Sequence, residues 1–95
     1  MTGYVIFQEN VFDKAEFDRY KSLSPASIEK FGGKFVVRGG GIEALEGEFE
    51  FERVVIIAFP NTDAARAWYR SDDYAEAKEL RLKISSGEAI LVEGV

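Results

Sequence analysis

Two absences restrict the chemistry open to this chain of 95 residues: it contains no cysteine and no histidine. Disulfides, thiolate nucleophiles, Ser-His-Asp triads and most zinc, haem and iron–sulfur sites are therefore excluded. Any catalysis has to use carboxylates, lysine or arginine, tyrosine, serine or threonine, or an external cofactor. We predict no resident cofactor and no metal site, although carboxylates alone could bind Mg²⁺ or Ca²⁺.

Arg38 is the first candidate ligand-binding residue. It ends an expected strand at residues 34–38, and three glycines follow it at 39–41. Glycines let a ligand approach the backbone closely, and a guanidinium binds a carboxylate or an enolate through two parallel hydrogen bonds. The alternative is that Arg38 pairs with an acid such as Glu46 near a subunit interface, and that the glycines only form a turn.

Aromatic residues of the segment AWYRSDDY, 67–74, form a second group of candidates. Trp68 and Tyr69 point about 100° apart on a helix, so they face different surroundings. We expect Trp68 in the core and the Tyr69 hydroxyl in a cleft, where it could donate a hydrogen bond or a proton. Tyr74 could line the same pocket. The alternative for all three is packing.

Residues 42–52, IEALEGEFEFE, alternate acidic and apolar side chains. An extended strand would place the glutamates on one face and the phenylalanines on the other. We interpret this segment as the solvated arm of a hairpin rather than a cation site. Glu46 and Arg53 flank the arm and could position a substrate, but a salt bridge is the simpler explanation. Arg81 is expected at the surface, near a helix end whose dipole favours a cation.

Net charge and hydropathy limit the partners. The chain has 12 basic and 17 acidic residues, for a net charge of −5, and no basic stripe, which argues against nucleic-acid binding. No apolar run is long enough to cross a bilayer, and the N-terminus does not resemble a signal peptide. We expect one cytoplasmic domain over residues 1–95 without membrane contact, with enough hydrophobic content, 46%, for a packed core.

The predicted elements alternate between strands and helices. Strands are expected at residues 3–11, 34–38, 53–59 and 88–94. Helices are expected after the N-caps Asp13, Asn61 or Thr62, and Ser71, with a kink or restart at Pro25 and an end at Gly32-Gly33. The order β-α-β-β-α-β is typical of an α+β, ferredoxin-like protomer with a four-stranded antiparallel sheet.

The strand at 53–59, RVVIIAF, is apolar on both faces. A sheet with one solvated face should instead alternate apolar and polar residues. The helices of this fold cover only one face, so something else must cover the other. Because the chain has no spare segment, we predict a homodimer with the two sheets packed face to face.

Several strings together resemble one protein family: GGKFVVRGG (32–40), LEG (45–47), RVVIIAFP (53–60), AWYRSDDY (67–74) and VEG (92–94). In this order and spacing they resemble the DUF1330 proteins, small bacterial domains of unknown function in the dimeric α+β-barrel superfamily. The resemblance covers nearly the whole chain and implies a ferredoxin-like protomer paired sheet to sheet. Two departures are Ala58, where a carboxylate is frequent, and Asp72, where a proline often follows the serine. The first weakens any role for an essential acid there.

The functional hypothesis is a small-molecule pocket between sheet and helices, lined by Phe7, Arg38, Trp68, Tyr69 and Tyr74. Its ligand would be a small organic molecule, such as a carboxylate. In a catalytic version, Arg38 stabilises an oxyanion while Tyr69 or a carboxylate moves a proton. The sequence does not distinguish this enzyme from a non-catalytic binder, or from a structural or protein-interaction dimer without a pocket.

Overall fold

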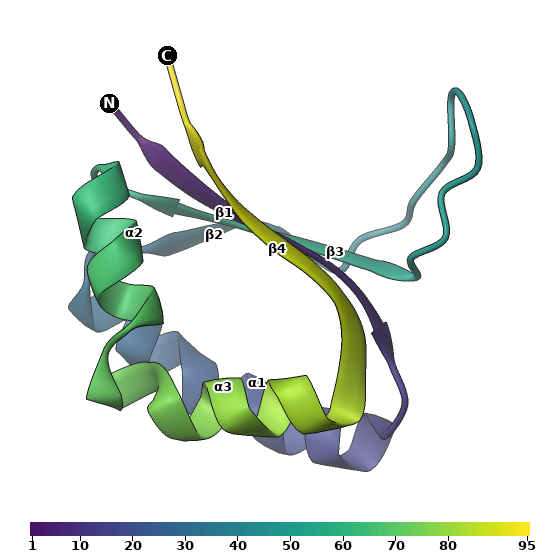
Figure 1. Ribbon diagram of the computed structural model, residues 1–95, viewed down its shortest axis with the longest axis horizontal. Helices are drawn as coiled ribbons and strands as arrows, with labels where there is room; N and C mark the ends of the chain where they lie inside the picture. Colours follow the sequence, from purple (N-terminus) through teal and green to yellow (C-terminus); the bar gives the residue numbers. More distant parts are fainter.

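The computed structural model describes residues 1–95 as an antiparallel sheet of four strands, in the order β2-β3-β1-β4, with three helices on one face (Figure 1). The elements are β1 (Gly3–Val11), α1 (Lys14–Lys30), β2 (Lys34–Arg38), β3 (Arg53–Phe59), α2 (Thr62–Tyr69), α3 (Asp72–Ile84) and β4 (Ser85–Glu93). The predicted ferredoxin-like α+β protomer is confirmed. None of the helices is both long enough and apolar enough to span a membrane.

Each helix begins at a side-chain cap that the sequence predicted. Asp13, Asn61 and Ser71 each accept a hydrogen bond from the backbone amide three residues further on, at 3.0, 2.8 and 3.2 Å respectively. These bonds satisfy amide groups that have no partner within the helix. The caps on α2 and α3 divide the second helical region into two pieces, which lets the chain turn sharply between them.

The first helix continues through Pro25 as a single helix. Of the two outcomes predicted there, a kink or a restart, the restart is therefore wrong. Proline removes one backbone hydrogen bond, but buried side chains on both sides of it, Phe17 and Ile28, belong to one face packed on the core. The predicted stop at Gly32 and Gly33 is confirmed, since their amides bond back into the last turn of α1.

The hairpin arm expected at residues 42–52 is solvated as predicted but is not an extended strand, because residues 39–52 form an irregular loop. No neighbouring strand is present to pair with this segment, and alternation alone does not make a strand without one. The end of the loop is fastened by Asn10, which donates to the Glu50 carbonyl at 3.0 Å and accepts from the Glu52 amide at 2.7 Å.

The last strand starts at Ser85 rather than at residue 88 and follows α3 without an intervening turn. The earlier start arises because β4 pairs with β1 along its whole length, from Ser85 opposite Val11 to Glu93 opposite Gly3.

The core lies between the helices and one face of the sheet. Trp68 is 0% exposed and is surrounded by rings, with centroids 4.1 Å from Tyr74, 5.3 Å from Phe59 and 6.3 Å from Phe7. Its indole N–H donates to the Ser27 hydroxyl of α1 at 3.0 Å. This one side chain therefore joins all three helices to the sheet.

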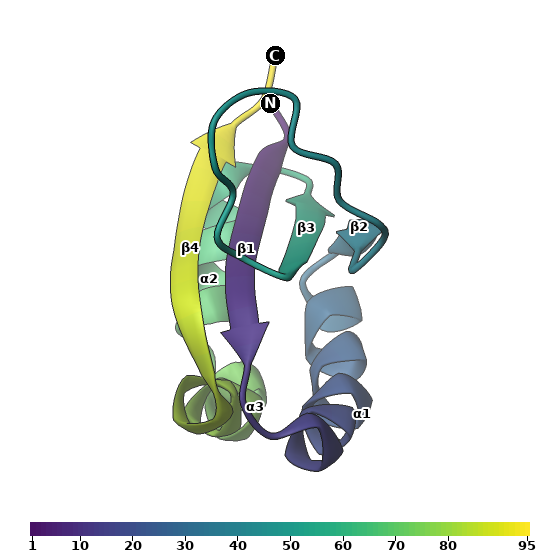
Figure 2. The same ribbon diagram turned by 90° about the vertical axis from the view of Figure 1, so that its right-hand side faces the viewer.

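No element of the chain covers the opposite face of the sheet, which we call the open face (Figure 2). Ile6 on β1 lies between Ile56 of β3 and Ile90 of β4, so apolar side chains cross the face from strand to strand. Towards the β4 edge they are markedly exposed, at 53% for Ile90 and 40% for Val92. The prediction that the sheet is apolar on both faces is confirmed.

The central position of Trp68 gives a testable prediction. We expect Trp68→Ala to lower the free energy of unfolding by about 3–5 kcal/mol, because it removes a fully buried ring system and leaves a cavity. Leu82→Ala, at a position 61% exposed, should change the same quantity by less than about 0.5 kcal/mol. Denaturant unfolding measures both. A loss below about 1 kcal/mol for Trp68→Ala would contradict its central place in the core.

Candidate functional site

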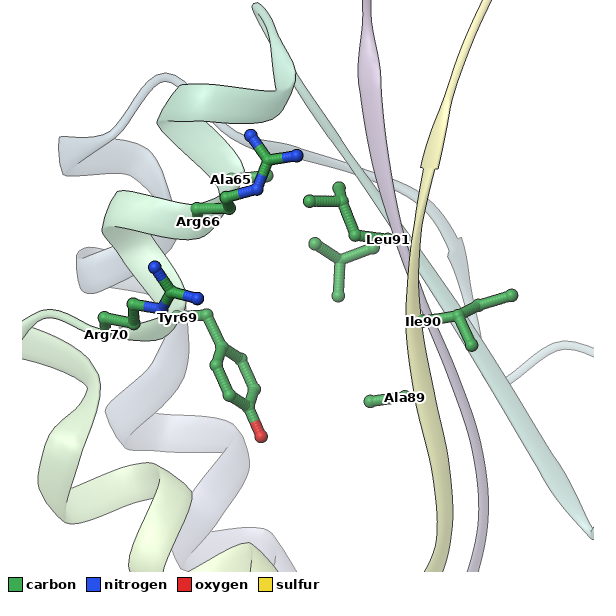
Figure 3. Close-up of a pocket in the computed structure, with 8 residues that line it drawn as sticks. Ala65, Arg66, Tyr69, Arg70, Ala89, Ile90 and Leu91 are labelled. Carbon is green, nitrogen blue, oxygen red and sulfur yellow. The ribbon is translucent and has the colours of Figure 1, made fainter.

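A cleft of about 280 Å³ opens between α2 and the edge strand β4 (Figure 3). The side of the cleft formed by the sheet is apolar, and the side formed by α2 carries two arginines. The lining residues are Val5, Ala65, Arg66, Tyr69, Arg70, Ala89, Ile90 and Leu91.

Helix α2 presents the polar side chains of the cleft. Arg66 and Arg70 are four residues apart and Tyr69 lies between them, so helical spacing places all three on neighbouring positions of one surface. Figure 3 shows both guanidinium groups at the helix side of the cleft and the Tyr69 ring extending into the space between α2 and β4. The sequence-based expectation that Tyr69 faces a cleft matches this geometry.

The Tyr69 hydroxyl belongs to a hydrogen-bond network that runs into the interior. Arg81 of α3 donates to it from Nη2 at 3.5 Å and to the Tyr74 hydroxyl from Nε at 3.2 Å. The Tyr74 and Tyr20 hydroxyls are 2.7 Å apart. Burial raises the pKa of both Tyr20 and Tyr74, so these two phenols remain protonated at neutral pH.

Arg81 is itself buried, with 7% of its surface exposed, and it forms no ion pair. Its guanidinium carbon lies 4.7 Å from the centre of the Phe7 ring. The expectation that Arg81 would be a surface residue is wrong, because the buried face of α3 includes Tyr74 and Arg81, two turns apart. That spacing is the signal in the sequence that could have located it.

Glu9 is the only buried carboxylate of the interior, with 3% of its surface exposed. One oxygen is 3.6 Å from Nε of Arg53, and the other, Oε2, has no hydrogen-bond partner. Burial raises the pKa of Glu9, and the positive charges of Arg81 and Arg53 oppose the rise only in part. Glu9 follows Val5 and Phe7 at every second residue, so strand alternation could have placed it inside.

The remaining candidates from the sequence do not meet in one pocket. Phe7, Trp68 and Tyr74 pack against one another and fill the interior that the predicted pocket would have occupied. Arg38 lies at the far edge of the sheet, exposed, with its guanidinium carbon 4.2 Å from the centre of the Phe35 ring.

Arg38 and Glu46 are the two candidates that lie outside both the aromatic core and the cleft. The cavity that Arg38 shares with Glu9 has a volume of about 10 Å³, which is room for one water molecule at most. Glu46 is exposed in the loop 39–52 and forms no ion pair with Arg38. No group of three acidic side chains is arranged to hold a metal ion. Of the six candidates, only Tyr69 lines the cleft.

The fold and the cleft define a small ferredoxin-like α+β protein with its polar groups gathered between a helix and an edge strand. The chain belongs to the family described as Domain of unknown function (DUF1330), whose model matches residues 2–95. None of the curated proteins matches the chain.

Solved structures resemble it over nearly its whole length. The RPA0582 protein of unknown function from Rhodopseudomonas palustris has a TM-score of 0.80 at 18% identity, with 99% of this chain and 82% of that chain covered. SnoaB, a cofactor-independent oxygenase from Streptomyces nogalater, has a TM-score of 0.62 at 20% identity, covering 99% and 91%. A dimeric ferredoxin-like protein of unknown function from Thermobifida fusca has 0.61 at 12%, covering 99% and 92%. These similarities establish the fold.

The raised pKa of Glu9 gives a prediction about pH. A carboxyl whose pKa is higher in the folded than in the unfolded protein stabilises the fold fully below its usual value of 4.5 and loses that contribution as the pH rises through the folded pKa. We therefore expect the unfolding free energy of the wild type, relative to Glu9→Gln, to fall as the pH rises from 4.5 towards 7, by at most about 1.4 kcal/mol per pH unit.

Urea unfolding at several pH values measures this difference, and Glu79→Gln, at an exposed position, controls for the loss of one surface charge. A wild-type curve that stays parallel to that of Glu9→Gln would contradict the raised pKa.

Proposed function

We propose that this protein is a homodimer that binds a small organic anion in the cleft between α2 and β4. The observation that carries the proposal is the buried Arg81, which forms no salt bridge and donates a hydrogen bond to the one tyrosine that lines the cleft. Two arginines, Arg53 and Arg81, face a single buried carboxylate, Glu9. The cluster formed by Glu9, buried Arg81 and half-buried Arg53 thus has positive charge in excess, in a protein whose net charge is −5.

An anionic ligand would compensate this excess charge. A buried charge is costly unless it is paired, and neutral hydroxyls compensate a guanidinium only in part. A tyrosine hydroxyl has a single proton. Because the Tyr69 oxygen accepts from Arg81, its own proton remains free to be donated to a ligand oxygen. Tyr69 therefore places in the cleft a hydrogen-bond donor that is polarised by the charge of Arg81.

The volume and lining of the cleft suit a small organic acid of about one ring. Its volume, about 280 Å³, lies at the small end of the range for ligand pockets. Val5, Ala89 and Leu91 supply an apolar wall, and Arg70, which forms no salt bridge, provides positive potential at the opening beside Arg66, which is paired with Asp63 at 3.1 Å.

The same arrangement would support acid–base chemistry without a cofactor. A tyrosine held by an arginine is a preorganised donor for a developing oxyanion or enolate. SnoaB, described as a cofactor-independent oxygenase, is an example of an enzyme without a cofactor on a similar fold. A catalytic role and simple binding use the same residues here, and turnover of a bound ligand would distinguish them.

The rival function is a structural or protein-interaction dimer without a ligand. It is favoured by the interior between Phe7, Trp68 and Tyr74, which aromatic rings fill. In that case the hydrogen bond from Arg81 to Tyr69 would only satisfy the hydrogen-bonding groups of these two side chains.

The open face supports the dimeric state. It is apolar from β3 to β4 and no helix or strand of its own chain covers it, and exposed apolar surfaces of that kind mark interaction sites. A second copy packed sheet to sheet buries the face on both protomers at once. The protein from Thermobifida fusca, described as dimeric and ferredoxin-like, supports dimerisation by analogy.

Ligand binding can be tested with benzoate and its neutral analogue benzamide. We expect benzoate, followed by amide chemical shifts, to perturb the residues around Tyr69 and Leu91 and to bind more tightly than benzamide. Tyr69→Phe should weaken benzoate binding about tenfold, the usual effect of losing one hydrogen bond to a charged group. Tyr4→Phe is the matched control, because it removes a tyrosine hydroxyl from β1 on the open face, outside the cleft. It should leave the benzoate affinity unchanged within about twofold.

Arg81→Gln, checked for folding by circular dichroism, removes the buried charge and should abolish the preference for benzoate over benzamide. A preference that survives this substitution, or equal binding of both compounds by the wild type, would contradict the proposed anion site.

The dimer can be tested by sedimentation at micromolar concentration. We expect the wild type to sediment as a dimer and Val92→Asp, which places a charge on the open face, to sediment as a monomer. Leu82→Asp introduces the same charge at an exposed position of α3 and should remain dimeric. A monomeric wild type would rule out the homodimer.

A further inference from the structure

The loop at residues 39–52, which we call the arm, is exposed along most of its length and carries unusually exposed apolar side chains. Leu45 is 88% exposed, Ile42 is 42% exposed and Phe49 is 38% exposed. A solvated loop normally carries polar and turn-forming residues. Apolar side chains at these positions indicate a surface that another molecule covers.

The arm is fastened to the sheet at both ends. At its start, the amide of Gly39 donates to the Val54 carbonyl at 2.9 Å. At its end, Asn10 makes its two hydrogen bonds, and the Glu52 carboxylate accepts from the amide of Val11 at 3.2 Å. These bonds set the direction in which the arm leaves the sheet.

That direction is away from the helices, on the side of the open face (Figure 1). A groove of about 400 Å³ lies where the arm meets the sheet, between arm residues such as Leu45 and Phe49 and the open-face residues Gln8 and Val54. The apolar side of the arm and the apolar open face are therefore parts of one continuous surface. A molecule seated on the sheet would contact both.

We propose that the occupant is a second copy of this chain and that each arm clasps the other protomer of the dimer. This inference rests on the homodimer proposed above. Arm residues 43, 46, 48, 50 and 52 are all glutamates, a charge that disfavours nucleic acid and anionic membranes as partners. The arm rises at one end of the sheet, so a two-fold axis that lies between the two faces and runs across the strands would set the two acidic arms at opposite ends, where they do not repel each other.

The test measures the dimer dissociation constant by sedimentation for the full chain and two matched variants, Leu45→Asp and Leu82→Asp. Both leucines are exposed, at 88% and 61%, so neither substitution should unfold the protomer, which circular dichroism checks. We expect Leu45→Asp to raise the dissociation constant about tenfold or more, as loss of an apolar anchor in an interface does, and Leu82→Asp to change it less than about twofold. Leu45→Ala should lie between these values.

The failures of the two proposals can be told apart. If the wild type dimerises and Leu45→Asp changes its dissociation constant less than about twofold, the arm has no part in the interface and only this inference is overturned. If the wild type is a monomer, both the clasping arm and the homodimer are overturned.

Discussion

The interaction on which most of this structure depends is the contact between Trp68 and Tyr74, whose ring centres are 4.1 Å apart. It holds α2 against α3 across the sharp turn at Ser71, and the indole N–H adds α1 through Ser27. Because Trp68 must face inwards, its neighbour Tyr69 is turned towards the edge of the sheet, where the cleft lies. The packing of one residue thus sets the direction of the one beside it.

Packing of the same core buries the positive charge of Arg81, and the proposed function follows from the need to compensate that charge. Tyr74 brings its hydroxyl to Arg81, and the helix that carries both buries a guanidinium without an acidic partner. Glu9 reduces the excess positive charge but lies nearer to Arg53, to which it is paired. The hydrogen bond from Arg81 to Tyr69 leads towards the cleft between α2 and β4, which is open to an anion from solution. In the proposed function, that anion is the ligand.

The open face poses a different requirement, which the chain cannot meet alone. Three helices cover one side of the sheet, while the other side remains apolar and, near Ile90 and Val92, exposed. The arm stands beside this face with Leu45 in solvent. In the proposed dimer, a second copy covers both the open face and the apolar side of the arm, because one two-fold axis pairs the faces and places each arm against the opposite protomer. The cleft at α2 lies on the helix side of β4, so binding of a ligand and assembly use separate surfaces.

The sequence by itself determined the elements that rest on local physics. Runs of β-branched and aromatic residues gave β1 and β3, and the caps at Asp13, Asn61 and Ser71 set the helix starts, because these signals act within a few residues. It also determined that both faces of β3 are apolar. The continuous helix through Pro25 and the irregular arm were decided by tertiary structure, since one has a buried face to stabilise it and the other lacks a strand to pair with. The site was decided in the same way: Arg38 and Tyr69 were placed at opposite edges of the sheet, and Arg81 was drawn inside by the packing around Tyr74, a contact between side chains that no local pattern encodes.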